Sequence, residues 1–235
     1  MPSIEIVWLG HSTFRITTPE GKLLLIDPWV MNNPACPEAF RQVERLDAML
    51  ISHGHFDHIG DAVELGLAHQ CETIAIFETA HWLEKKGLKN TRPMNKGGTQ
   101  EVAGVRVTMV HADHSCGILE GDRIVYGGEA SGLILEFSNG FRIYHSGDTN
   151  LFGDMKLIGQ LYQPDLAMLP IGGLYTMSPK EAALAIEFLG VKQVVPMHHS
   201  TFPALPGTPN ELRQRMSQTS GYVQHDLKPG EALCL

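Results

Sequence analysis

The chain has 235 residues, a formal net charge of −8 at pH 7 and 43% hydrophobic residues. This length and composition fit a globular α/β protein, and we expect residues 1–235 to form a single domain. A protein that binds polynucleotides normally carries a basic face, so the acidic balance disfavours nucleic acid as a partner.

The N-terminus and the cysteines bear on the compartment in which the protein works. The first residues lack the basic and apolar regions of a signal peptide, and no apolar run approaches the ~20 residues that a membrane-spanning helix needs. The four cysteines are widely spaced and form no Cys-x-x-Cys pair, which disfavours a zinc ribbon or a redox dithiol. We therefore expect a cytoplasmic protein with free thiols and no membrane span.

The first half of the chain is rich in predicted strands. Short apolar runs separated by turn residues predict strands at 4–9, 14–17, 22–26, 48–52 and 73–77, and helices at 61–69 and 79–86. Two hairpins are predicted next, over 99–110 and 132–145. The second hairpin carries Asn139-Gly140 in its turn, which is a strong hairpin signal.

The second half alternates strands with helices. Strands are predicted at 165–171 and 193–197, and helices from Ser178 to Gly190 and from Thr208 to about Gln218. Each helix start has the spacing of a capping box, Ser178 with Glu181 and Thr208 with Glu211. Mixed strands followed by helices, twice over, predict two packed sheets with helices on the outside.

The run His53-Gly54-His55-Phe56-Asp57-His58 directly follows the apolar segment 48–51. Imidazole and carboxylate groups are good ligands for zinc and other first-row metals. In an extended segment His53, His55 and Asp57 would share one side, while His58 would point elsewhere. This pattern indicates ligands for two adjacent ions; a histidine-rich surface turn is the alternative.

Further candidate ligands follow the ends of other predicted strands. They are His111 and His114 after strand 105–110, Asp148 after 141–145, and His198 and His199 after 193–197. Loops at strand ends can converge on one rim of a sheet. Imidazoles and carboxylates collected there indicate a functional site more than core packing.

These motifs together resemble the metallo-β-lactamase superfamily: His-x-His-x-Asp-His, a later lone His, Gly147-Asp148-Thr149 and a final His after an apolar strand. The segments 9–12, 25–28 and 169–172 resemble its branch of uncharacterised metal-dependent hydrolases, related to ascorbate-6-phosphate lactonases and N-acyl-phosphatidylethanolamine phospholipases. The resemblance covers the whole chain. It implies an α/β fold, an αβ/βα four-layer sandwich of two mixed β-sheets with helices on the outside.

The resemblance also implies two divalent metal ions, zinc first, with manganese, iron or nickel compatible with the same nitrogen and oxygen ligands. The first metal would be held by His53, His55 and His114, the second by Asp57, His58 and His198, and Asp148 would bridge them. His111 in place of His114 and His199 in place of His198 stay open as alternatives.

The implied activity is hydrolysis. A hydroxide shared by two metals would attack an ester, lactone or phosphodiester of a small-molecule substrate. Asp57 would orient the hydroxide and later carry its proton, and His199 could act as an acid. The alternatives are a non-catalytic metal-dependent binding or regulatory protein, or a phosphodiesterase or nuclease of the same superfamily; a homo-oligomer is left open.

Three other residues have two interpretations each, and a fourth has one. Asp27 either orients a ligand histidine from behind or only forms a turn before Pro28. His11 either contacts substrate or is a buried structural histidine. Tyr175 could assist an oxyanion or be an ordinary loop residue, and His145 is expected to pack behind the site.

Overall fold

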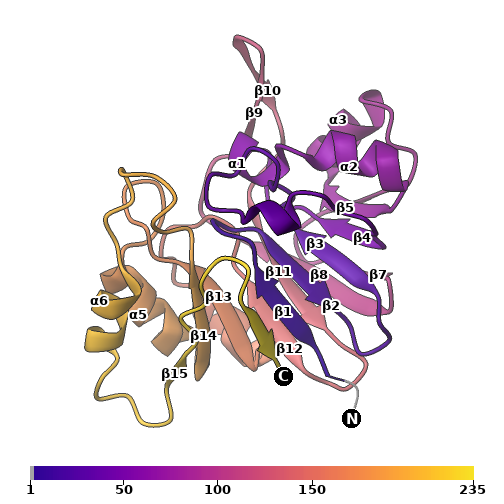
Figure 1. Ribbon diagram of the computed structural model, residues 1–235. Helices are drawn as coiled ribbons and strands as arrows, with labels where there is room; N and C mark the ends of the chain where they lie inside the picture. Colours follow the sequence, from indigo (N-terminus) through magenta and orange to yellow (C-terminus); the bar gives the residue numbers. More distant parts are fainter. Residues whose placement is uncertain (1–2) are drawn as a thin grey trace.

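A computed structural model describes residues 3–235. Two seven-stranded β-sheets lie face to face, and helices cover the outer side of each sheet (Figure 1). The predicted four-layer α/β architecture is confirmed. In the described part of the chain, no helix is long and apolar enough to cross a membrane.

The first sheet has an antiparallel part and a parallel part. Its strands are β1 (Glu5–Trp8), β2 (Phe14–Thr17), β3 (Leu23–Ile26), β4 (Ala48–Leu50), β5 (Glu72–Ile76), β6 (Thr91–Met94) and β16 (Ala232–Cys234). The order is β16-β1-β2-β3-β4-β5-β6. Pairing is antiparallel from β16 to β3 and parallel from β3 to β6. The C-terminal strand therefore lies beside the N-terminal one.

The second sheet repeats this mixed plan. Its strands are β7 (Thr99–Val102), β8 (Val105–His111), β11 (Ser131–Glu136), β12 (Arg142–His145), β13 (Leu166–Pro170), β14 (Gln193–Met197) and β15 (Val223–Gln224), in the order β15-β14-β13-β12-β11-β8-β7. Pairing is parallel from β15 to β12 and antiparallel from β12 to β7. A separate hairpin of β9 (Gly117–Glu120) and β10 (Arg123–Tyr126) projects from the body at the top of Figure 1.

The helices divide between the two outer faces. They are α1 (Phe56–Ile59), α2 (Ala62–His69), α3 (Phe77–Lys85), α4 (Met155–Tyr162), α5 (Pro179–Leu189) and α6 (Pro209–Arg215), with a 3₁₀ turn, η1 (Glu38–Phe40). Helices α2 and α3 pack on the first sheet, and α4, α5 and α6 pack on the second.

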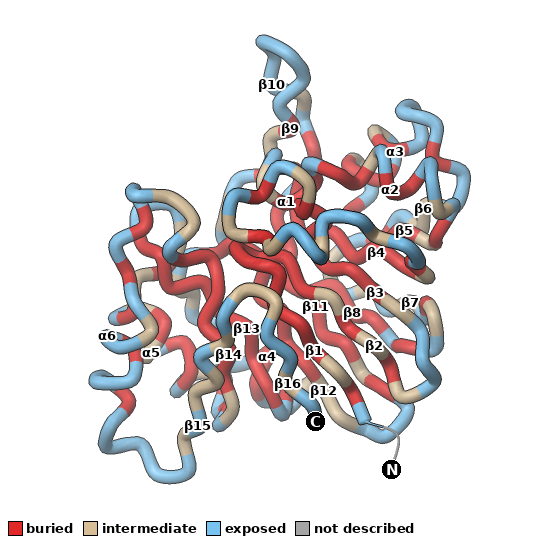
Figure 2. The backbone as a smooth tube through the Cα atoms, viewed as in Figure 1, coloured by how far each residue is buried: buried red, intermediate tan, exposed pale blue. Residues whose placement is uncertain are grey.

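The main core lies between the sheets. Inward side chains of both sheets, such as Ile6, Phe14, Leu133 and Met168, are fully buried there, and Figure 2 shows the facing strands as a continuous buried band. Removal of this apolar surface from water is the main force that holds the sheets together. The ends of the central strands are fixed by this core, so loops that leave those ends start from rigid positions.

The predicted helix signals are largely confirmed. Both capping boxes form: the Ser178 side chain accepts from a backbone N–H of the first turn of α5, and Glu181 accepts from the Ser178 N–H. Thr208 and Glu211 do the same for α6. Helix α6 ends at Arg215, so the predicted extension to Gln218 is wrong.

Helix α4, which contains Gly159, was not predicted from the sequence. The structure gives the reason for this glycine. A Cβ at position 159 would come within 2.2 Å of the Leu189 carbonyl oxygen. The missing side chain lets α4 pack closely against the end of α5.

Candidate metal centre

The seven residues predicted as metal ligands meet at one end of the strands of the two sheets. His53 leaves the end of β4, His114 follows β8, Asp148 follows β12 and His198 follows β14. The loop after β1 adds His11 to the same place. Strands from both sheets thus deliver side chains separated by up to 187 positions in sequence to one cluster.

Three overlapping groups of ligand atoms make up the cluster. Within each group the atoms lie within 4.8 Å of one another: His53, His55 and His114; His53, His58 and Asp148; and His11, Asp57, His58 and His198. Each predicted ligand belongs to at least one group. The two predicted metal sets correspond to the first and third groups, with His11 added to the third.

Asp148 lies between the groups. Its Oδ2 is 3.0 Å from His198 Nε2 and 3.3 Å from His58 Nε2. The same oxygen is 3.7 Å from His114 Nε2 and 4.0 Å from His53 Nε2. One carboxylate within reach of histidines from both sets has the placement that a bridging ligand requires.

The donor atoms suit first-row metal ions. Zinc bonds nitrogen and oxygen at about 2.0–2.2 Å, so ligands that share an ion lie about 3–4 Å apart. His55 Nδ1 lies 3.0 Å from His53 Nε2 and 3.3 Å from His114 Nε2, which matches that spacing.

Several of the converging atoms have no hydrogen-bond partner. Within residues 3–235 the buried atoms His58 Nε2, Asp148 Oδ1 and His198 Nε2 form no well-aligned hydrogen bond, although the two ring nitrogens lie close to Asp148 Oδ2. An unpaired buried polar atom is costly, so such atoms call for an explanation. A metal ion held by this set would supply one, and the residues present therefore fit the metals that the sequence implies.

The motif residues do not form the continuous extended segment that the sequence argument assumed. His55 caps α1, which begins at Phe56, so Asp57 and His58 are helical. The period-two argument for His53, His55 and Asp57 is therefore wrong. The helix turn instead directs Asp57 and His58 toward one group while His53 and His55 serve the other.

Asp27 fixes two of the histidines from behind. It is fully buried, and its Oδ2 lies 2.7 Å from His58 Nδ1 and accepts from Ser52 Oγ at 2.7 Å. Its Oδ1 accepts from the Ser52 N–H at 2.8 Å, and Ser52 Oγ lies 2.9 Å from His53 Nδ1. Of its two interpretations, the orienting carboxylate is the one the contacts support.

His11 contacts Asp57 rather than the cavity. Its side chain is fully buried, with Nε2 2.9 Å from Asp57 Oδ2 and Nδ1 3.0 Å from Thr201 Oγ1. Its backbone carbonyl accepts from the His198 N–H at 3.0 Å. The sequence offered substrate contact or structural packing for His11, and neither anticipated this link to a candidate ligand.

Backbone strain gathers at the same place. His11, Asp27 and His198 adopt positive φ values of 56°, 48° and 52°. Non-glycine residues in this region carry a steric cost, and such residues concentrate at functional sites. His11 and His198 belong to the cluster and Asp27 contacts His58, so three of the positive-φ residues help to hold its geometry.

The pKa values separate the histidines by environment. Burial, together with the neighbouring His58, lowers the pKa of His53 well below its usual value. Burial also lowers the pKa of His58, but Asp148, Asp27 and Asp57 outweigh it and raise that pKa well above the usual value. Burial raises the pKa of Asp148, whereas His198 and His58 pull it well below its normal range. Asp148 is thus anionic, as a carboxylate ligand must be.

The alternative histidines lie outside the cluster. His111 is exposed, with Nδ1 3.1 Å from Lys96 Nζ. His199 is buried with its ring 5.1 Å from that of Trp8, and burial lowers its pKa to about 4. His199 also does not line the cavity beside the cluster. His145 is fully buried behind the site, 3.1 Å from the Ser12 carbonyl oxygen.

A cavity of about 530 Å³ opens beside the cluster. Cluster residues His55, Asp57, His114, Asp148 and His198 form one wall. The rest of the lining consists of Phe56, Ser115, Tyr175, Phe202 and Ala204. This size suits a small molecule held against the candidate metal ligands.

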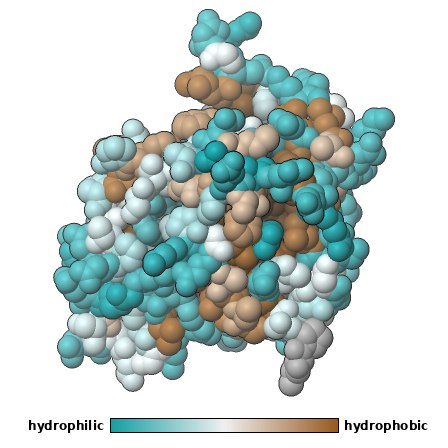
Figure 3. All heavy atoms as spheres, viewed as in Figure 1, coloured by the Kyte–Doolittle hydropathy of each residue, from teal (hydrophilic) through white to brown (hydrophobic). Residues whose placement is uncertain are grey.

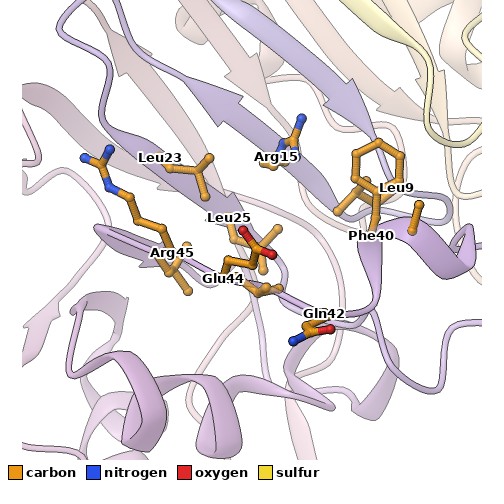
Figure 4. Close-up of a pocket in the computed structure, with 11 residues that line it drawn as sticks. Leu9, Arg15, Leu23, Leu25, Phe40, Gln42, Glu44 and Arg45 are labelled. Carbon is orange, nitrogen blue, oxygen red and sulfur yellow. The ribbon is translucent and has the colours of Figure 1, made fainter.

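A second cavity of about 430 Å³ lies on the outer face of β1–β3 (Figure 4). Leu9, Leu23 and Leu25 form its floor beside Arg15 and Phe40. Hydrophobic residues also reach the surface over this part of the molecule in Figure 3. The lining contains no histidine and one carboxylate, Glu44, so the groups capable of metal chemistry belong to the first cavity.

Two mixed sheets with a His/Asp cluster at their common edge define a metallohydrolase of the metallo-β-lactamase class, and comparison with known proteins agrees. A family model described as a β-lactamase superfamily domain matches residues 22–199. A UPF0173 metal-dependent hydrolase of Koribacter versatilis is 55% identical over 231 residues, 98% of each chain. One from Methanosarcina mazei is 40% identical over the full length of both.

Solved structures support the same assignment. Igni18, a metallo hydrolase from the archaeon Ignicoccus hospitalis, is similar with a TM-score of 0.87 and 34% identity over 99% of this chain and 98% of its own. The chain therefore belongs to the UPF0173 metal-dependent hydrolases of the metallo-β-lactamase superfamily. It is a metal-dependent hydrolase, and the superfamily expected from the motifs is confirmed.

Proposed function

We propose that this protein is a dinuclear metal hydrolase that cleaves an ester, lactone or phosphodiester bond of a small molecule. The observation that carries the proposal is the position of Asp148 between two sets of converging histidines. We assign His53, His55 and His114 to one ion and Asp57, His58 and His198 to the other, with Asp148 shared. The nitrogen and oxygen donors suit zinc.

Metal ions held by these residues would lower the pKa of bound water toward 7 and polarise the bond under attack. Side chains of the protein would orient the water, accept its proton and position the substrate. Asp57 lines the cavity and contacts His11, so its carboxylate is held in place to orient the attacking water and to accept its proton. The cavity walls would keep the scissile bond beside the cluster.

A matched pair of variants tests the assignment. His114 and His111 are three positions apart, but only His114 belongs to the cluster. We expect His114→Ala to lose close to one bound metal per chain and about a hundredfold or more in hydrolysis of bis-p-nitrophenyl phosphate or of a lactone. His111→Ala should keep both metals and the activity. The proposal is contradicted if the two variants behave alike in metal content and rate.

The competing interpretation is a metal-dependent binding or regulatory protein. Such a protein would load metal at the cluster and yet hydrolyse neither esters, lactones nor phosphodiesters. A fully metal-loaded sample without turnover on any of the three classes would favour it over the hydrolase.

A further inference from the structure

Apart from the candidate ligands and the Ser115 and Tyr175 hydroxyls, the cavity beside the cluster is lined by apolar groups. From its aromatic walls and its lack of cationic groups we infer that the substrate is a neutral carboxylic ester or lactone with an apolar chain, and that a substrate with a second anionic group is rejected. The inference rests on the proposed hydrolytic function and adds the chemical class of the substrate.

One wall is a row of aromatic rings. Phe56 lies directly before Asp57 and is 55% exposed. Its ring centroid is 6.0 Å from that of Trp29, and Trp29 stacks on Phe202 at 6.0 Å with an interplanar angle of 30°. Trp29 is only 4% exposed, so it anchors the two rings that face the cavity. A large, rigid apolar surface beside a polar cluster is typical of a binding site.

The loop after β13 adds another aromatic ring to the lining. Tyr175 lines the cavity and is 61% exposed, and its neighbour Leu174 is 71% exposed. Leu174 has a positive φ of 55°. An apolar ligand that covered these exposed side chains would remove their apolar surface from water, which is favourable.

The charges of the residues that line the cavity disfavour a substrate with a second anionic group. Among the described residues that line the cavity there is no lysine or arginine, and the charged groups are the carboxylates of Asp57 and Asp148. The polar groups other than the cluster are the Ser115 and Tyr175 hydroxyls. A phosphate or carboxylate on the distal part of a substrate would lose water there without gaining a cation, which is unfavourable.

The test compares two esters of equal length. p-Nitrophenyl hexanoate and mono-p-nitrophenyl adipate both have a six-carbon acyl chain, but the adipate ends in a carboxylate. We expect kcat/KM for the hexanoate to exceed that for the adipate by about tenfold or more, and to exceed that for p-nitrophenyl acetate by about tenfold. Equal rates for the two six-carbon esters, or a preference for the adipate, would overturn the inference.

Variants of the cavity lining test which side chains select the acyl chain of the substrate. Phe202→Ala should reduce the hexanoate-to-acetate ratio of kcat/KM by about threefold or more. The matched control is Phe77→Ala, because Phe77 is 57% exposed but lies on α3 outside the cavity; this variant should keep the ratio. Ala204→Lys places a cation on the rim and should raise the adipate-to-hexanoate ratio by about threefold. An unchanged ratio in both cavity variants would show that these walls do not select the substrate.

A binding measurement separates this inference from the proposed activity. Hexanohydroxamic acid and adipic monohydroxamic acid carry the same metal-binding group and differ at the far end. Calorimetry on the metal-loaded protein should give about tenfold tighter binding of the hexanoyl compound. That preference without turnover of esters, lactones or phosphodiesters would support the cavity's selection of neutral apolar chains and contradict the proposed hydrolysis. Turnover together with equal binding of the two hydroxamates would support the proposed hydrolysis and contradict the inference about the substrate.

Discussion

Asp27 is a fully buried carboxylate that contacts His58 directly and His53 through Ser52. The residues behind metal ligands fix their orientation and proton position, and their loss typically costs 10- to 100-fold in metal affinity. We therefore expect Asp27→Asn to weaken metal binding by about that factor, as measured by competition with a chromogenic chelator. Asp122→Asn, in the exposed β9–β10 turn, is the control. If the two variants bind metal with equal affinity, Asp27 does not orient the metal ligands.

His11 should matter for one metal and not for the other. It contacts Asp57, and its backbone accepts from the His198 N–H, so both of its links go to the second set of candidate ligands. We expect His11→Ala to lower metal content from about two to about one per chain. His11→Gln, which keeps a polar group near Asp57, should retain more of the second metal. Loss of both metals, or of neither, in His11→Ala would contradict this role.

Sequence reasoning identified the ligand candidates and offered Asp27 as a supporting residue, but it did not identify the partners of His11 and His145. A histidine next to a carboxylate in one short motif is visible in the sequence, and so is the position of a residue after a strand. The contact of His11 with Asp57 joins residues 46 positions apart, and the link from His145 to Ser12 spans 133. Such contacts depend on how the sheets pack, which local patterns do not encode.

Helix α5 shows how local sequence signals act at the level of one element. The Ser178 side chain and the Glu181 carboxylate accept from backbone N–H groups at the start of the helix that would otherwise be unpaired. Pro179, at the first helical position, has no N–H that needs a partner. We expect Ser178→Ala to lower the free energy of unfolding by about 1 kcal/mol, as measured by urea denaturation. Ser217→Ala, at an exposed position after α6, should change it by less than about 0.5 kcal/mol. Equal losses would mean that the cap contributes nothing specific.

Elements with strong local signals were mostly predicted, although the local hairpin of β9 and β10 was not. The hairpin with Asn139-Gly140 forms between β11 and β12, with Gly140 at a φ of 83°. The short strands β15 and β16 were missed because they pair with β14 and β1, far away in the sequence. The one-turn helix α1 was missed because its four residues are too few to show a helical period.

At the scale of the whole molecule, the metals would join the two sheets. The candidate ligands come from loops after β4 in one sheet and after β8, β12 and β14 in the other. A ligand that binds only the folded state stabilises it in proportion to its free concentration and affinity. Added zinc should therefore raise the Tm of the metal-free protein by several degrees. The His114→Ala variant should show a smaller rise; an equal rise would place the stabilising metal elsewhere.

The central claim is a two-metal site organised around Asp148, and metal content tests it most directly. Inductively coupled plasma mass spectrometry on the purified protein, paired with hydrolysis before and after chelation, gives both quantities in one preparation. The account predicts about two metal ions per chain, with turnover lost on chelation and restored by zinc. About one ion per chain after full reconstitution, or turnover that persists in the metal-free protein, would contradict it.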